Sequence, residues 1–219
     1  MSDSADRLRV VRDGIASAAK HAGRSPNEIE LVAVSKGRST QEIEEMIAAG
    51  QLDFGENRVQ EAEAKWPALR ASYPDVRLHE VGRLQSNKAS EAVALFDVVH
   101  SLDRMSLLDA LAREAAKAGR CPDLYVQVNI GAEEQKGGCA IGDVPALVAA
   151  VRKRELPLLG LMAIPPANLE PAPFFALLAK LATREGLSGL SMGMSSDYRA
   201  AVMLGATCVR VGSALFEDE

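Results

Sequence analysis

The chain has 219 residues, of which 47% are hydrophobic and 25% are charged, and its formal net charge at pH 7 is −5. Such a chain can bury a sizeable core without disulfides or a structural metal, and an acidic balance without a basic stripe argues against a nucleic-acid partner. The three cysteines lack CxxC spacing, the first residues are polar, and no apolar run approaches the roughly 20 residues that span a bilayer, so we expect a cytoplasmic protein with no membrane contact.

Hydrophobic periodicity predicts an alternation of strands and helices along the whole chain. The predicted strands cover residues 31–36, 53–56, 78–82, 96–100, 124–130, 158–163, 189–192 and 208–212. The predicted helices cover residues 8–23, 39–50, 57–69, 103–119 and 195–204, with others beginning near residues 85, 143 and 174. One helix therefore precedes the first strand, one follows each of the first seven, and only a short acidic tail follows the eighth.

Strict alternation with short connections indicates parallel strands joined by right-handed crossovers. Eight such units predict an α/β fold, a (β/α)₈ TIM barrel in a single domain over residues 1–219, with an extra N-terminal helix. A doubly wound open sheet has the same alternation and stays as the alternative. In a barrel, the residues that follow the strands meet at one end, which we call the mouth, and sites are built there.

Lys36 directly follows the predicted first strand, whose other residues are apolar or small. A lysine at the end of a buried strand is partly removed from water, which lowers its pKa and frees an amine for Schiff-base chemistry. The alternative is a lysine that extends to solvent or pairs with a carboxylate.

Two turns at the ends of the last two strands suit a phosphate group. Ser195 and Ser196 open the predicted seventh-strand helix, and Gly212 and Ser213 follow the eighth strand. Free N–H groups and the positive end of the helix dipole favour an anion there, and barrels often bind phosphate after strands seven and eight. Taken singly, Ser195 is equally consistent with a helix cap and Gly212 with a tight turn.

An amine opposite two phosphate turns predicts pyridoxal 5′-phosphate (PLP), which has an aldehyde, a flat ring and a phosphate. Lys36 would take the aldehyde, and Arg210 would face the pyridine nitrogen or the phosphate. Asn57 and Met162 would line the faces of the ring. The alternatives are an ion pair for Arg210, a helix cap for Asn57 and a core methionine for Met162.

Six stretches resemble the pyridoxal phosphate homeostasis protein family, whose barrel is similar to that of alanine racemase. They are Val32–Lys36, Phe54–Glu61, His79–Lys88, Gly160–Pro165, Leu190–Ser195 and Val209–Gly212. The resemblance spans almost the whole chain and implies a monomeric or weakly associating barrel that carries PLP, the vitamin B6 cofactor, as a Schiff base on Lys36. It implies buffering or delivery of the cofactor without an established turnover, with apo-enzymes that use PLP as candidate partners. Lys136 matches a lysine that the family uses in cofactor transfer, although the surrounding Gln135–Gly138 departs from the family pattern.

Two other functions use the same amine. The first is a PLP-dependent racemase or decarboxylase on this barrel, but racemases add a second domain that supplies a tyrosine base, and we expect none here. The second is a cofactor-free Schiff-base aldolase, which needs a carboxylate beside Lys36, and Glu56 is the strand-end candidate. The sequence also leaves open whether Cys139, in a polar loop, is reactive.

Overall fold

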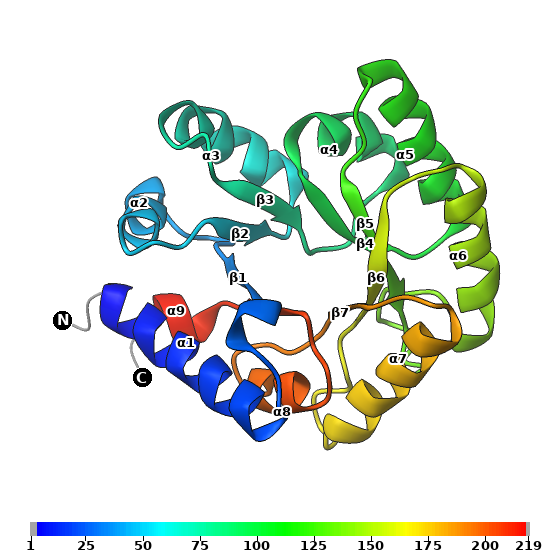
Figure 1. The fold of residues 1–219 in the computed structure, drawn as a ribbon. Coiled ribbons are helices and arrows are strands. Elements are labelled where there is room, and N and C mark those ends of the chain that lie inside the picture. Colours follow the sequence, from blue (N-terminus) through cyan, green and yellow to red (C-terminus); the bar gives the residue numbers. More distant parts are fainter. Residues whose placement is uncertain (1–3, 218–219) are drawn as a thin grey trace.

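The computed structural model describes residues 4–217 and shows eight strands in a closed barrel (Figure 1). Every strand is parallel to its neighbours, and β1 closes the barrel by pairing with β8. The strands are β1 (Glu30–Val34), β2 (Asp53–Glu56), β3 (Arg77–Glu80), β4 (Val98–Leu102), β5 (Asp123–Val128), β6 (Leu158–Ala163), β7 (Gly189–Ser191) and β8 (Cys208–Val211). The predicted TIM barrel is confirmed, and the open sheet is excluded.

Helices surround the barrel as an outer ring (Figure 1). They are α1 (Ser4–His21), α2 (Thr40–Ala48), α3 (Val59–Ser72), α4 (Ala89–Leu95), α5 (Met105–Ala118), α6 (Val144–Lys153), α7 (Ala172–Arg184), α8 (Tyr198–Met203) and α9 (Ser213–Phe216). The predicted extra N-terminal helix is α1. Short 3₁₀ turns cover Pro26–Glu28, Ser86–Lys88 and Ile141–Asp143.

Two predictions about the end of the chain were wrong. The helix after β7 begins at Tyr198 and not at Ser195, because the Asp197 carboxylate accepts a hydrogen bond from the Met194 backbone N–H and holds the intervening residues in a turn. The segment after β8 is the short helix α9 and not only a tail, since Leu215 and Phe216 are buried. Helix α9 lies beside α1, so the two ends of the described chain come together (Figure 1).

Alternate side chains of each strand face the lumen or the helices, which gives the barrel two different interiors. The large apolar core lies between the strands and the helices. The lumen is different, because its apolar residues form a much smaller cluster around Val98, Tyr125 and Met162. The rest of the lumen contains buried polar groups, and a hydrogen bond between His100 of β4 and Ser191 of β7 must cross it, because these strands are not neighbours.

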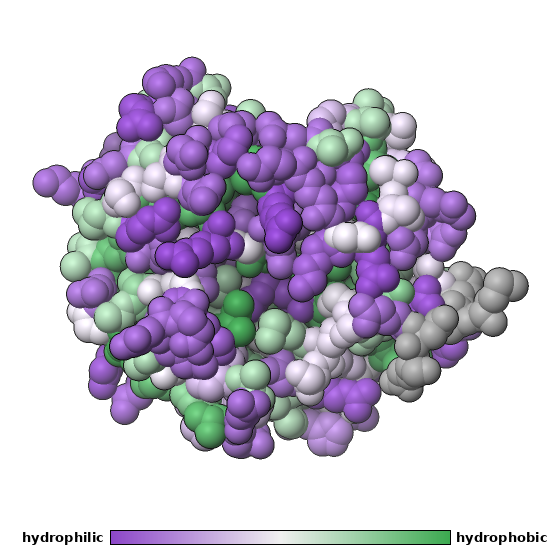
Figure 2. All heavy atoms as spheres, turned by 180° about the vertical axis from the view of Figure 1, so that it is seen from behind, coloured by the Kyte–Doolittle hydropathy of each residue, from purple (hydrophilic) through white to green (hydrophobic). Residues whose placement is uncertain are grey.

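The outer surface is mostly hydrophilic, with small apolar areas scattered over the face in Figure 2. Each long helix buries one side against the barrel and exposes its charged side. None of the helices described is both long and apolar enough to cross a membrane.

Candidate functional site

Lys36 lies two residues beyond the end of β1, at the mouth of the barrel. It has the same position in the strand alternation as Val32, which is fully buried in the lumen. Its side chain is exposed, so the expected partial burial of the amine is absent. The exposed amine can react with a molecule that arrives from solvent. In this conformation Lys36 matches the alternative expectation, a lysine that extends to solvent.

The residues on both sides of Lys36 are fixed by one ion-pair cluster. The Ser35 hydroxyl donates to the Glu56 carboxylate at 2.8 Å, and the Gly37 N–H donates to the Glu61 carboxylate at 2.6 Å. The Lys65 ammonium joins the two carboxylates, at 2.7 Å from Glu56 and 2.9 Å from Glu61. The backbone that carries Lys36 is therefore held in place, while its side chain is free.

Glu56 faces away from Lys36. It is fully buried on the helix side of β2, where it also accepts a hydrogen bond from the Trp66 indole N–H at 3.1 Å. The lumen position next to it in the strand is Gly55, where an added Cβ would lie 3.1 Å from a Val32 methyl carbon. Glu56 is thus committed to a structural ion pair, and the acid/base partner that an aldolase requires is not supplied by it.

The turns after β7 and β8 are joined through Ser195. Its hydroxyl oxygen accepts hydrogen bonds from the backbone N–H groups of Gly212 at 3.2 Å and Ala214 at 3.3 Å. Ser195 therefore does not cap its own helix but binds the start of α9. The hydroxyl hydrogen is still available as a donor, and the neighbouring Ser196 and Ser213 side chains are exposed.

Arg210 is buried in the lumen, with 4% of its surface exposed. Its guanidinium donates to the Ser191 hydroxyl and to the Ala163 carbonyl, the latter at 3.1 Å. Burial lowers the pKa of Arg210, while the more distant Asp197 carboxylate acts in the opposite direction, and within residues 4–217 no carboxylate forms an ion pair with it within 4.0 Å. A buried cation without a direct ion-pair partner is costly, so this arrangement favours a ligand that brings an acceptor or a negative charge.

Asn57 and Met162 have different environments. Asn57 is half-buried just after β2, and the N-cap of α3 is Arg58, so Asn57 is not the cap. Its backbone lies against Gly82, where an added Cβ would come within 2.2 Å of the Asn57 carbonyl oxygen. Met162 is fully buried in the lumen cluster, which matches the alternative expectation of a core methionine.

The loop after β5 brings a second amine toward the mouth. The Lys136 ammonium lies 2.6 Å from the Glu133 carboxylate and donates to the Pro165 carbonyl, just after β6, at 2.9 Å. Cys139, in the same loop, is buried, and burial raises the pKa of its thiol to about 12. A buried thiol of this pKa stays protonated at neutral pH, and the protonated form is a poor nucleophile.

The sequence analysis missed the polar lumen and the buried Glu80. His79, His100 and Ser191 are fully buried, and a chain of hydrogen bonds joins them across the lumen. The signal was present, because two histidines and a serine lie within predicted strands, where buried polar residues are uncommon. The alternation alone does not say which of the two interiors such residues face.

Glu80 gives a pH-dependent prediction for stability. It is buried on the helix side of β3, and burial raises its pKa from 4.5 to about 8, although the Ser101 hydroxyl donates to it at 2.6 Å. The folded protein therefore keeps a proton that the unfolded chain releases near pH 4.5, so stability should fall as the pH rises toward 8. Thermal unfolding of Glu80→Gln should show a flatter dependence on pH.

The best range for this test is from about pH 6.5 to 8, the upper limit set by the pKa of Glu80. Burial lowers the pKa of His100 well below 6.5, so His100 makes stability rise with pH only below that value. Identical slopes for Glu80→Gln and the unaltered protein above pH 6.5 would show that Glu80 is ionised in the fold.

Comparison with known proteins assigns the chain to a family. The family model for the alanine racemase N-terminal domain matches residues 8–219. The pyridoxal phosphate homeostasis protein of Pseudomonas aeruginosa is 44% identical over 225 residues, which cover 99% of this chain and 96% of that protein. This chain belongs to the pyridoxal phosphate homeostasis protein family. The protein of the same name from Escherichia coli K12 is 38% identical and covers 99% of this chain and 97% of its own.

Solved structures agree with this family. PipY from Synechococcus elongatus, solved with PLP bound, is 39% identical with a TM-score of 0.86 and covers 97% of this chain and 99% of its own. Alanine racemase from Streptomyces lavendulae has a TM-score of 0.72 at 20% identity, and the match covers 98% of this chain and 58% of the racemase. The pyridoxal phosphate homeostasis family thus shares its barrel with the racemase, and the predicted resemblance is confirmed.

Proposed function

We propose that this protein binds PLP at the mouth of the barrel, holds it as a Schiff base on Lys36 and serves PLP homeostasis in the cytoplasm. The observation that carries the proposal is the buried guanidinium of Arg210, which has no direct ion-pair partner among residues 4–217, on the strand next to the exposed Lys36. PLP supplies what both groups need, since its pyridine nitrogen or phosphate can accept from the guanidinium and its aldehyde can react with the amine. The PLP-bound PipY structure supports the choice of ligand.

The mouth offers donors for each part of this ligand. For the phosphate, the Ser195 hydroxyl hydrogen and the exposed hydroxyls of Ser196 and Ser213 are available, beside the backbone of Gly212. For the ring, Asn57 lies at the edge of the mouth and Met162 lies below it. We propose these residues, with Lys36 and Arg210, as the binding set.

Lys36 would supply the amine for the covalent attachment. Condensation of an amine with an aldehyde forms a C=N bond and releases one water, made from the aldehyde oxygen and the two hydrogens of the unprotonated amine. The step is reversible because water reaches the exposed lysine. An amine from another protein can displace Lys36 by the same exchange, which suits buffering and delivery to apo-enzymes.

Arg210 disfavours catalysis on this cofactor. The bound cofactor can act as an electron sink for carbanions, and this property is strongest when the ring nitrogen is protonated. A guanidinium has no acceptor and stays charged, so a nitrogen that accepts from Arg210 is held without its own proton. The protein therefore retains the cofactor rather than using it.

A test of the proposed function combines binding with turnover. Purified protein freed of ligand should bind PLP at close to one equivalent in equilibrium dialysis. A chiral assay with alanine and a panel of other amino acids should show no racemisation or decarboxylation above that of free PLP. Absence of saturable PLP binding would refute the proposal. Sustained turnover that Lys36→Ala abolishes would establish the racemase or decarboxylase alternative instead.

A further inference from the structure

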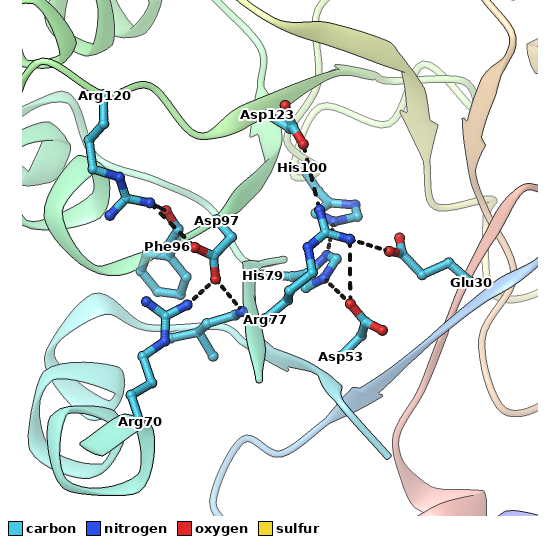
Figure 3. A network of polar contacts seen from close by, with 11 residues as sticks. Glu30, Asp53, Arg70, Arg77, His79, Phe96, Asp97, His100, Arg120 and Asp123 are labelled. Atoms are coloured by element: carbon cyan, nitrogen blue, oxygen red, sulfur yellow. Dashed lines mark hydrogen bonds and ion pairs between the residues drawn. The ribbon is translucent and has the colours of Figure 1, made fainter. Parts of the chain in front are cut away.

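A continuous chain of hydrogen bonds runs along the lumen from one end of the barrel to Arg210. The Asp53 carboxylate lies 3.2 Å from Nε2 of His79, and Nδ1 of His79 lies 3.0 Å from Nε2 of His100. Nδ1 of His100 lies 2.8 Å from the Ser191 hydroxyl, which in turn contacts the Arg210 guanidinium. Figure 3 shows the first part of this chain, from Asp53 through the two imidazoles.

The Asp53 end of the chain sets one direction for its protons. The Asp53 carboxylate only accepts, so a His79 ring with one proton carries it on Nε2 and accepts at Nδ1 from Nε2 of His100. Nδ1 of His100 is then an acceptor, and the Ser191 hydroxyl donates to it. The Ser191 oxygen keeps its lone pairs for Arg210, which only donates, so this direction satisfies every contact in the chain.

The surroundings keep this arrangement fixed. Burial lowers the pKa of His100, and positive charge on His79, Arg210 and Arg77 acts in the same direction, so the His100 ring stays neutral. The Tyr125 ring stacks on His100, with centroids 4.7 Å apart and planes 20° from parallel. At the outer end the Arg77 guanidinium lies 3.6 Å from Asp53 and 2.8 Å from Glu30, which holds the terminal carboxylate (Figure 3).

We infer that Ser191 is a positioning residue for Arg210, and that the chain through His100, His79 and Asp53 fixes its hydroxyl in the accepting orientation. This inference rests on the proposed function. The other hydrogen bond of the guanidinium among residues 4–217 goes to the Ala163 carbonyl. Without Ser191, Arg210 is held at one point and can rotate away from the mouth. Ser191 and His100 therefore control the orientation in which Arg210 faces the ring nitrogen of the bound cofactor.

The test is a double-mutant cycle between Ser191→Ala and Arg210→Met. The Ser191→Ala variant loses a hydrogen bond to the charged guanidinium of Arg210, so it should bind PLP roughly 10-fold more weakly, or weaker still. In the Arg210→Met background the same change should have no further effect, because its target is gone. The visible spectrum of bound PLP, followed with pH, should also shift in Ser191→Ala toward that of Arg210→Met.

Ser101→Ala is the matched control. Ser101 is as buried as Ser191 and lies next to His100 in β4, but its hydroxyl bonds to Glu80 on the helix side. The Ser101→Ala variant should bind PLP with the same affinity and show the same spectrum as the unaltered protein. If Ser191→Ala proves too unstable to measure, His100→Phe keeps the stack on Tyr125, removes both ring nitrogens and should shift the spectrum in the same direction.

The outcomes separate the inference from the proposed function. Binding by the unaltered protein, together with equal, independent losses from Ser191→Ala in both Arg210 backgrounds, would overturn the positioning role and leave the proposed function intact. Failure of the unaltered protein to bind PLP would refute the proposed function itself. A spectrum in Ser191→Ala that matches the unaltered protein at every pH would also overturn the inference.

Discussion

Replacing Lys36 with alanine is expected to abolish covalent attachment of PLP altogether. The Lys36 amine is exposed at the mouth, on a backbone that Glu56 and Glu61 hold through Ser35 and Gly37. Alanine removes the amine and leaves this support intact, so the variant should fold normally. Borohydride reduction of PLP-loaded protein, followed by mass spectrometry, should detect the reduced adduct in the unaltered protein and none in Lys36→Ala.

Lys136→Ala is the control for this experiment. The Lys136 ammonium is held by Glu133 and the Pro165 carbonyl, close enough to the mouth to be the first alternative amine. We expect Lys136→Ala to keep the full adduct on Lys36. A full-yield adduct in Lys36→Ala, mapped to Lys136, would transfer the assignment to that residue.

Gly212→Val is expected to weaken the binding of PLP but to have little effect on pyridoxal, which lacks the phosphate. A Cβ added at Gly212 would meet Val34 at 3.6 Å, which is an ordinary contact, but the backbone angles of φ −116° and ψ −82° lie outside the main allowed regions. The larger side chain should crowd the phosphate beside Ser195, and the thermal stability of the variant without ligand must be measured as well. Because a hydrogen bond to a charged group is worth roughly 1.5–3 kcal/mol, the loss for PLP should be about 10- to 150-fold.

Two further variants qualify this result. Gly212→Ala adds only the Cβ and should lie between the unaltered protein and Gly212→Val in PLP affinity. Ser195→Ala removes the acceptor of the Gly212 and Ala214 N–H groups, so its thermal stability must be measured without ligand as well. Equal losses for PLP and pyridoxal in Gly212→Val would mean that the turn supports the fold in general and that the phosphate binds elsewhere.

The barrel could be predicted from the sequence because its information is local. Runs such as Leu31–Val34 read as buried strands, and each is followed by a helix with an apolar face. Ser39 and Glu42 mark the start of α2 with a reciprocal capping box. The end of the chain was harder. Ser195 looked like the cap of a helix, but its hydroxyl bonds to the turn after β8, a contact between residues 17 and 19 positions apart.

The lumen could not be predicted because its contacts join strands far apart in the sequence. The His100–Ser191 bond spans 91 residues, and no local pattern reports it. Lys36 shows the same limit in the other direction. Its position after β1 could be read from the sequence, whereas its exposure depends on how Ser35 and Gly37 are held by residues of β2 and α3.

The most direct test of the central claim is the visible absorption spectrum of the unaltered protein with PLP, before and after borohydride reduction, followed by peptide mapping. The account predicts a visible band that reduction removes, and one equivalent of the reduced adduct on the peptide that contains Lys36. A protein that binds PLP without a band sensitive to borohydride, or one whose adduct maps to any lysine other than Lys36, would contradict it.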